Sequence, residues 1–125
     1  MNIETLSVQG SSGGDEKTGA ISFPIYQTAT FKHLGLNKST GYDYSRDTNP
    51  TREEVEKTIA KLENGLGAIG FSSGVASIVC CIHLFKCGDH IILSEDLYGG
   101  TFRLFNETFK DFGISCTFVD TTNPS

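Results

Sequence analysis

The chain of 125 residues has the length of one domain and is long enough to bury a core. Its 10 basic and 15 acidic side chains give a formal net charge of -5, which argues against nucleic-acid binding because that function needs a basic surface. Hydrophobic residues make up 38% and charged residues 20% of the sequence, proportions typical of a globular chain and not of a disordered one.

No segment predicts membrane insertion or secretion. The longest mostly apolar run, residues 75–85, is about half as long as a bilayer-spanning helix, and residues 1–10 lack the basic and apolar regions of a signal peptide. The cysteines are Cys80, Cys81, Cys87 and Cys116. They show neither a C-x-x-C motif nor paired spacing, so we expect a cytoplasmic protein with reduced, mostly buried thiols and no metal site.

The composition changes near residue 48. Residues 1–20 are rich in glycine, serine and threonine and predict a loose leader. Residues 21–50 contain short apolar pieces without a helical period, which predicts an extended segment. We therefore interpret residues 1–48 as an extended N-terminal arm and residues 49–125 as the first part of an α/β domain.

Helices and strands are predicted to alternate from residue 49 onward. Asn49 and Pro50 supply an N-cap and a first residue for a helix that ends at residues 64–65, with Thr51 and Glu54 as an alternative capping box. Two further helices are predicted, a buried one over residues 74–85 and an amphipathic one after residues 99–100, and three strands, over residues 66–71, 90–94 and 114–119. This alternation predicts a parallel sheet covered by helices on both faces.

Two glycine motifs compete within residues 65–74. Residues 65–70 match the dinucleotide fingerprint formally, but a strand is predicted to run through the glycines, so no helix would begin at a pyrophosphate and we reject this interpretation. Residues 70–74 spell G-x-S-x-G, which would make Ser72 the nucleophile of a serine hydrolase. Only His83 and His90 follow Ser72, and no acid and histidine can complete a triad with it, so hydrolysis stays a remote alternative.

The same turn can instead bind an anion. A strand that ends at Phe71 and opens into a helix at Gly74 leaves the first helical amides unpaired, and those of Gly74 and Val75 could donate to a phosphate. The alternative is that Gly74 only permits the turn. The motif by itself leaves both interpretations open.

Aromatic and basic residues elsewhere favour the phosphate interpretation. In an extended segment Tyr44 and Arg46 point to the same side, where a hydroxyl and a guanidinium form a phosphate clamp. Tyr98 follows the strand over residues 90–94 and could stack on a planar ring. Each of these side chains also has an ordinary structural interpretation, as a loop tyrosine, a surface arginine or a tyrosine covering a turn.

The motifs together resemble the pyridoxal-phosphate-dependent enzymes of cysteine and methionine metabolism. The resemblance rests on Y-x-R-x-x-N-P-T at residues 44–51, S-S-G at 72–74, G-D-H-I at 88–91 and D-L-Y-G-G-T at 96–101. It covers nearly the whole chain in order. It implies the aspartate aminotransferase-like fold type I with a mainly parallel sheet, pyridoxal 5'-phosphate as cofactor, and a homo-oligomer, commonly a tetramer, whose arm bridges subunits.

The resemblance also implies roles for particular residues. Tyr44 and Arg46 would bind the cofactor phosphate of a neighbouring subunit, so that the active site is shared. Gly74 and Val75 would supply backbone amides to the phosphate. Tyr98 would stack on the pyridine ring and take part in proton transfer.

The resemblance is strongest to the branch of cystathionine γ-synthase and O-acylhomoserine sulfhydrylase. It implies γ-replacement on an O-acylhomoserine by cysteine to give cystathionine. Elimination by a cystathionine γ- or β-lyase or a methionine γ-lyase is the alternative; Gly100, where many methionine γ-lyases carry cysteine, disfavours the last. The family's cofactor-binding lysine would lie beyond residue 125, so we expect an N-terminal portion that is inactive alone or acts only in assembly or binding.

Overall fold

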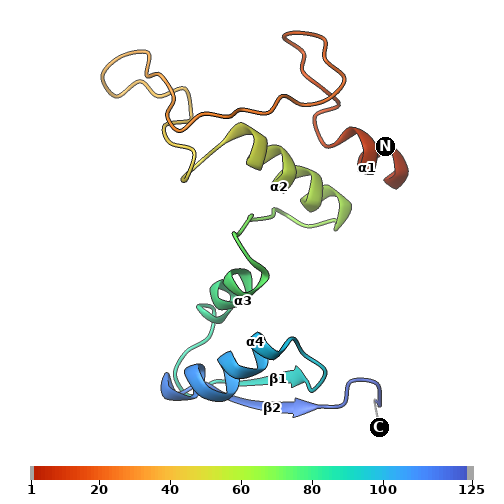
Figure 1. The fold of residues 1–125 in the computed structure, drawn as a ribbon, viewed down its shortest axis with the longest axis vertical. Helices are drawn as coiled ribbons and strands as arrows, with labels where there is room; N and C mark the ends of the chain where they lie inside the picture. Colours follow the sequence, from red (N-terminus) through yellow and green to blue (C-terminus); the bar gives the residue numbers. More distant parts are fainter. Residues whose placement is uncertain (1, 124–125) are drawn as a thin grey trace. The chain divides into compact units, whose positions relative to one another are not determined.

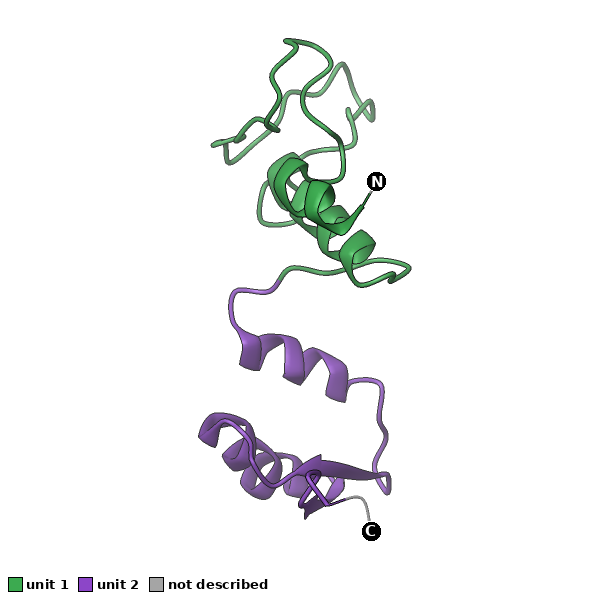
Figure 2. Ribbon diagram, turned by 90° about the vertical axis from the view of Figure 1, so that its right-hand side faces the viewer, with its two compact units in different colours: residues 1–70 green, residues 71–125 purple. Residues whose placement is uncertain are grey.

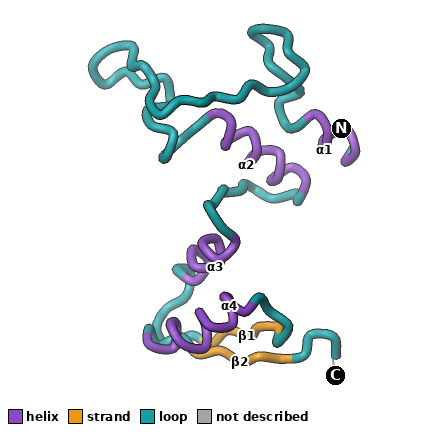
Figure 3. The backbone as a smooth tube through the Cα atoms, in the orientation of Figure 1, coloured by secondary structure: helices purple, strands orange, loops and turns teal. Residues whose placement is uncertain are grey.

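The computed structural model describes residues 2–123, and the chain divides into two compact units, Met1–Gly70 and Phe71–Ser125 (Figure 2). The elements in chain order are α1 (Ile3–Gln9), α2 (Pro50–Leu62), α3 (Gly74–Ile82), β1 (His90–Ser94), α4 (Gly99–Arg103), the π-helix η1 (Leu104–Phe109) and β2 (Ser115–Val119) (Figure 1). A long loop segment connects α1 to α2, and the rest of the chain contains helices, two strands and shorter loops (Figure 3). No helix among residues 2–123 is long and apolar enough to cross a membrane.

The N-terminal segment folds into a helix, so the prediction of a loose leader is wrong for residues 3–9. The side chain of Asn2 caps α1 by accepting a hydrogen bond from the amide of Thr5 at 2.9 Å. Gly10, with φ of 71°, ends the helix in a conformation that favours glycine. Contact with α2 holds this short helix, which is too short to be stable in isolation.

The arm that precedes α2 pairs with itself. The amide of Phe31 donates to the carbonyl of Asp43 at 3.0 Å, and the amide of Ser45 donates to the carbonyl of Ala29 at 2.9 Å, around an antiparallel bridge between residues 30 and 44. The predicted extended backbone is therefore present around residues 30 and 44, while the chain between them turns back at residues 35–38. After Tyr44 the chain turns instead of continuing extended, because two successive amides of residues 47 and 48 donate to its carbonyl at 2.9 Å.

Helix α2 begins where the sequence predicts. Asn49 is the N-cap and accepts from the amide of Thr51 at 2.8 Å, and Pro50 is the first helical residue. The alternative capping box does not form, because the Glu54 carboxylate accepts from the amides of residues 11 and 12 instead. On the same helix, Glu53 and Lys57 lie four residues apart and form an ion pair at 2.7 Å.

The strand predicted over residues 66–71 is absent. These residues form a loop, and Leu66 is fully exposed. A strand needs a neighbouring ladder to satisfy its backbone, and within the described part of the chain no segment pairs with this one.

The C-terminal unit contains the predicted parallel pair. Strands β1 and β2 run parallel in register from His90 opposite Ser115 to Ser94 opposite Val119. Apolar side chains of both strands pack on a small core formed by Ile82, Phe105, Phe109 and Ile114. Ile92 points away from this core and is 71% exposed, so the prediction that helices cover both faces is wrong for the described residues.

The helices of this unit deviate from prediction at their ends. Helix α3 ends at Ile82, three residues early, since the amides of residues 83–85 donate to carbonyls three positions back and tighten the last turn. Ile82 is the only buried residue of α3, so the predicted burial of this helix is largely wrong. The amphipathic helix is present as α4 and η1, whose Phe105 and Phe109 are buried.

The cysteines are free thiols, but their predicted burial is wrong. Cys80, Cys81 and Cys87 are exposed and Cys116 is half-buried. Cys80 and Cys81 lie on the exposed side of α3, although the apolar sequence of this helix predicts burial on most sides.

Candidate functional site

The turn that carries Tyr44 and Arg46 brings the predicted clamp together. The Arg46 guanidinium lies over the Tyr44 ring, 4.9 Å from its centroid, and both side chains are exposed. A cation over an aromatic face at an exposed site contributes roughly 0.5–1 kcal/mol. The two side chains thus share one side, as expected, although the segment is a turn after Tyr44.

Side-chain hydrogen bonds fix the base of this turn. Asn49 donates from Nδ2 to Ser45 Oγ at 2.9 Å and to the carbonyl of Tyr26 at 3.1 Å, while its Oδ1 caps α2. Ser45 in turn donates to the carbonyl of Thr28. The single side chain of Asn49 therefore ties the arm, the turn and the helix start to each other.

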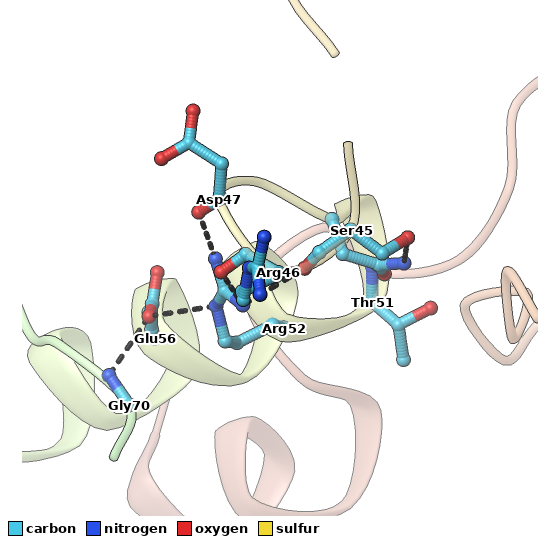
Figure 4. A network of polar contacts seen from close by, with 8 residues as sticks. Ser45, Arg46, Asp47, Thr51, Arg52, Glu56 and Gly70 are labelled. Carbon is cyan, nitrogen blue, oxygen red and sulfur yellow. Dashed lines mark hydrogen bonds and ion pairs between the residues drawn. The ribbon is translucent and has the colours of Figure 1, made fainter. Parts of the chain in front are cut away.

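Arg52 closes the turn from the other side. Its Nη1 donates to the carbonyls of Ser45 at 3.1 Å and Arg46 at 3.4 Å, and its Nη2 donates to the carbonyl of Asp47 (Figure 4). We did not predict a role for Arg52 from the sequence. The available signal was a cation in the first turn of α2, where the helix dipole disfavours positive charge.

Glu56 links Arg52 to the end of the first unit. Its Oε1 lies 3.5 Å from Arg52 Nε and accepts from the amide of Gly70 at 2.8 Å (Figure 4). A Cβ added at Gly70 would lie 3.3 Å from that carboxylate oxygen, so the backbone approaches Glu56 closely here. This pair surrounds part of an open groove of about 690 Å³, whose lining includes Arg46, Asp47, Glu53 and Ile69.

A phenol and a carboxylate interact in the wall of the same groove. Tyr42 donates from its hydroxyl to Glu53, and this hydrogen bond raises the pKa of Tyr42 to about 12. The hydrogen bond from Lys57 lowers the pKa of Glu53, with a further contribution from Tyr42. Glu53 is therefore ionised at neutral pH and Tyr42 is protonated.

The beginning of α3 leaves two amides available. Ser73 caps the helix by accepting from the amide of Ala76 at 3.1 Å, whereas the amides of Gly74 and Val75 have no acceptor within residues 2–123. A Cβ added at Gly74 would meet nothing within 4 Å, so the backbone is openly accessible there. The dipole of this nine-residue helix favours an anion at these amides.

Tyr98 lies at the start of α4 with 73% of its surface exposed. Its carbonyl accepts from the amides of Thr101 and Phe102, which fixes its backbone, and its ring crosses directly over Gly100. A Cβ at Gly100 would lie 2.5 Å from Tyr98 Cε1. The ring can hold this position only because residue 100 has no side chain.

The remote hydrolase interpretation receives no support from the geometry. The hydroxyl of Ser72 makes no hydrogen bond to either later histidine within the described residues, and His90 Nε2 is paired with Thr117 Oγ1 at 2.9 Å. The loop at residues 65–70 likewise begins no helix, which agrees with the rejection of the dinucleotide motif.

The candidate residues share one chemistry. Tyr44 and Arg46 lie together in the first unit, and Gly74, Val75 and Tyr98 belong to the second unit. The guanidinium, the Tyr44 hydroxyl and the two free amides are all hydrogen-bond donors, and none is occupied by a carboxylate of the described chain. Such a donor set fits a phosphate monoester.

Comparison with known proteins identifies a single family. The family model described as Cys/Met metabolism PLP-dependent enzyme matches residues 4–125. The chain is 47% identical to a Bacillus subtilis (strain 168) protein named cystathionine gamma-synthase/O-acetylhomoserine (thiol)-lyase, over 96% of this chain and 32% of the relative. It is 48% identical to the cystathionine beta-lyase of Lactococcus lactis subsp. cremoris (strain MG1363), over 98% of this chain and 32% of the relative.

A solved structure agrees with these sequence matches. The cystathionine gamma-lyase of Lactobacillus plantarum, complexed with L-serine, matches with a TM-score of 0.86 and 46% identity over 98% of this chain and 32% of that structure. The chain thus spans about a third of the length of these relatives, which differ in the activity they are named for. It belongs to the family of PLP-dependent enzymes of cysteine and methionine metabolism.

Proposed function

We propose that this chain forms the phosphate-binding part of a PLP-dependent transsulfuration enzyme. The observation that carries the proposal is the pairing of Arg46 with Tyr44 in a turn that Asn49 and Arg52 hold from both sides. The pair presents two hydrogen-bond donors for a phosphate on one exposed face. These donors would bind the phosphate of a cofactor in a neighbouring subunit of a homo-oligomer. In the same subunit as the cofactor, the amides of Gly74 and Val75 would complete the phosphate site.

The remaining candidate acts on the cofactor ring. The bound cofactor supplies an electron sink for carbanions next to the amino-acid nitrogen. The exposed ring of Tyr98 can stack on a pyridine face, and its phenol oxygen can accept and return a proton. The protein's contribution is thus to bind the phosphate, orient the ring and hold one proton at Tyr98.

We propose γ-replacement as the reaction, with an O-acylhomoserine and cysteine as substrates and cystathionine as product. The identity of 47% to a relative named for this activity supports the choice, and Gly100 disfavours a methionine γ-lyase. Elimination from cystathionine is the alternative, favoured by the identity of 48% to a relative named as a β-lyase.

A product assay separates the two reactions. The full-length protein containing this chain is incubated with PLP, cysteine and either O-acetyl- or O-succinylhomoserine, and products are identified by mass spectrometry. Cystathionine should accumulate only when all components are present. A parallel reaction receives cystathionine in place of these substrates. Its consumption with release of ammonia, and no synthesis from either ester, would show that the enzyme is a lyase.

A binding assay tests the phosphate site independently of the reaction. The Arg46→Ala variant of the full-length protein should bind PLP more weakly by on the order of tenfold or more, because charge-assisted hydrogen bonds to the phosphate are lost. Arg46→Lys should recover only part of the affinity, since an ammonium cannot bind two phosphate oxygens in parallel. Unchanged affinity in Arg46→Ala would refute the assignment of this side chain.

A further inference from the structure

We propose that Arg52 is a positioning residue that fixes the turn carrying Tyr44 and Arg46, and that Glu56 keeps the Arg52 charge away from the ligand. The inference rests on the proposed function of Arg46, which is to bind the cofactor phosphate. It concerns two side chains that touch neither the phosphate nor the reacting atoms.

The first argument is the convergence of three successive carbonyls on one guanidinium. Arg52 donates hydrogen bonds to the carbonyl oxygens of Ser45, Arg46 and Asp47. Three carbonyl dipoles that point to one place repel each other unless a cation neutralises them. The backbone of the turn therefore depends on Arg52 at the residues that carry and follow the clamp.

The second argument is that local helix chemistry disfavours this residue. Arg52 is the third residue of α2, among amides with a positive partial charge, where acidic side chains are preferred. Its ion pair with Glu56 at 3.5 Å and the turn carbonyls offset this unfavourable position. The arginine is explained by the turn that it holds and not by the helix that contains it.

The third argument is that two arginines line one groove and differ in their partners. Both Arg46 and Arg52 line the groove of about 690 Å³. Arg52 donates to three carbonyls and pairs with Glu56, whereas the side chain of Arg46 contacts only the Tyr44 ring among the interactions of the described residues. Arg46 thus remains free for an anionic ligand, while the charge of Arg52 is neutralised.

Glu56 connects this arrangement to the last residue of the first unit, Gly70. The carboxylate oxygen that pairs with Arg52 also accepts from the amide of Gly70, at 2.8 Å. The side chains of the pair are 36% and 23% exposed, so solvent screens the interaction only in part. Removal of Glu56 would release both the Gly70 amide and the guanidinium.

The experiment compares four variants of the full-length protein. Arg52→Met removes the guanidinium group, and Arg52→Lys keeps the positive charge without the planar geometry. Glu56→Gln removes the negative charge that faces Arg52. Lys57→Met is the matched control, since it removes a cation from the same helix that pairs with Glu53 and does not touch the turn. The readouts are amide hydrogen exchange at residues 47 and 48, the PLP dissociation constant, and kcat at saturating PLP.

Both Arg52 variants should accelerate exchange of the amides of residues 47 and 48, which donate to the Tyr44 carbonyl. The PLP dissociation constant should rise on the order of tenfold, while kcat at saturating PLP stays within about twofold because Arg52 touches no reacting atom. Glu56→Gln should give a smaller increase in the same direction. Lys57→Met should leave all three readouts unchanged.

Three results would overturn the proposal. The first is wild-type exchange and PLP affinity in Arg52→Met, and the second is full recovery by Arg52→Lys, which would mean that charge alone suffices. The third is an equal effect of Lys57→Met. These outcomes are distinct from failure of the proposed function, which is shown by unchanged PLP affinity in Arg46→Ala even when Arg52→Met alters exchange in the turn.

Discussion

Asn49 offers a sharp test of how the arm is attached to α2. Its Oδ1 accepts from the Thr51 amide at 2.8 Å, and its Nδ2 donates to Ser45 Oγ at 2.9 Å and to the Tyr26 carbonyl at 3.1 Å. Asn49→Ala removes all three bonds. Asn49→Asp keeps the cap and removes only the two donors, so the pair of variants separates the helix cap from the attachment of the arm.

The magnitudes follow from these contacts. Loss of an N-cap costs about 1 kcal/mol. The partly buried bond to Ser45 contributes about 1 kcal/mol and the exposed bond to Tyr26 about 0.5 kcal/mol. Asn49→Ala should therefore lower the free energy of unfolding by about 2.5 kcal/mol, and Asn49→Asp by about 1.5 kcal/mol.

Urea denaturation measures the free energies, and amide hydrogen exchange at Thr51 reports on the cap alone. Exchange at Thr51 should accelerate in Asn49→Ala and stay slow in Asn49→Asp. Asn2→Ala is the matched control, because Asn2 caps α1 with one bond at 2.9 Å and holds no second segment; it should cost about 1 kcal/mol or less. Wild-type stability in Asn49→Asp would refute the role of Nδ2 in attaching the arm.

Three further variants test other parts of the chain. Gly100→Ala should displace the Tyr98 ring, since the new Cβ would lie 2.5 Å from Cε1, and reduce kcat on the order of tenfold; unchanged kinetics would contradict the assignment of Tyr98. In a spectrophotometric titration Tyr42 should ionise with a pKa of about 12 and return toward 10.0 in Glu53→Gln. Because this pKa is raised, the stability contributed by Tyr42 is present below pH 10 and lost as the pH rises through 12. Gly14→Ala should destabilise the protein by more than 1 kcal/mol in urea, since φ is 123° and its Cβ would lie 2.4 Å from a backbone oxygen; a neutral effect would contradict this.

Local signals predicted most of the elements. The Asn49-Pro50 pair predicted the start of α2, and the strands predicted over residues 90–94 and 114–119 are present as β1 and β2, with an error of one residue at the start of β2. These signals act over a few residues, through a capping side chain or the alternation of side chains along a strand. The start of α2 therefore depends little on the rest of the chain, whereas β1 and β2 also need each other as pairing partners.

Predictions that required knowledge of neighbours were less accurate. The run at residues 66–71 is as apolar as β1, yet it forms a loop because no strand of the described chain pairs with it. The apolar sequence of α3 predicted burial on most sides, but only Ile82 is buried. Hydrophobicity indicates that a segment can be covered, and does not specify which segment covers it.

For the candidate site, the sequence indicated residue types and the structure decided their arrangement. The spacing of Tyr44 and Arg46 predicted a shared side, and the stacked pair shows it, but through a turn that the spacing did not predict. Arg52 was not predicted as part of the site because its partners are backbone carbonyls, which every residue has. Sequence patterns reveal side chains, whereas a group of carbonyls becomes a binding site only when the chain folds back on itself.

The sequence by itself determined where α2, α3 and β1 begin, which residues can donate to an anion, and the family to which the motifs point. Only the tertiary structure decided that the arm is tied to α2 by Asn49, that one arginine holds the turn while the other stays free, and that one face of the parallel pair is left open. The physical reason is the separation along the chain between the residues that interact. Capping and periodicity act between residues a few positions apart, while hydrogen bonds between distant segments exist only after the backbone has brought their atoms within about 3 Å.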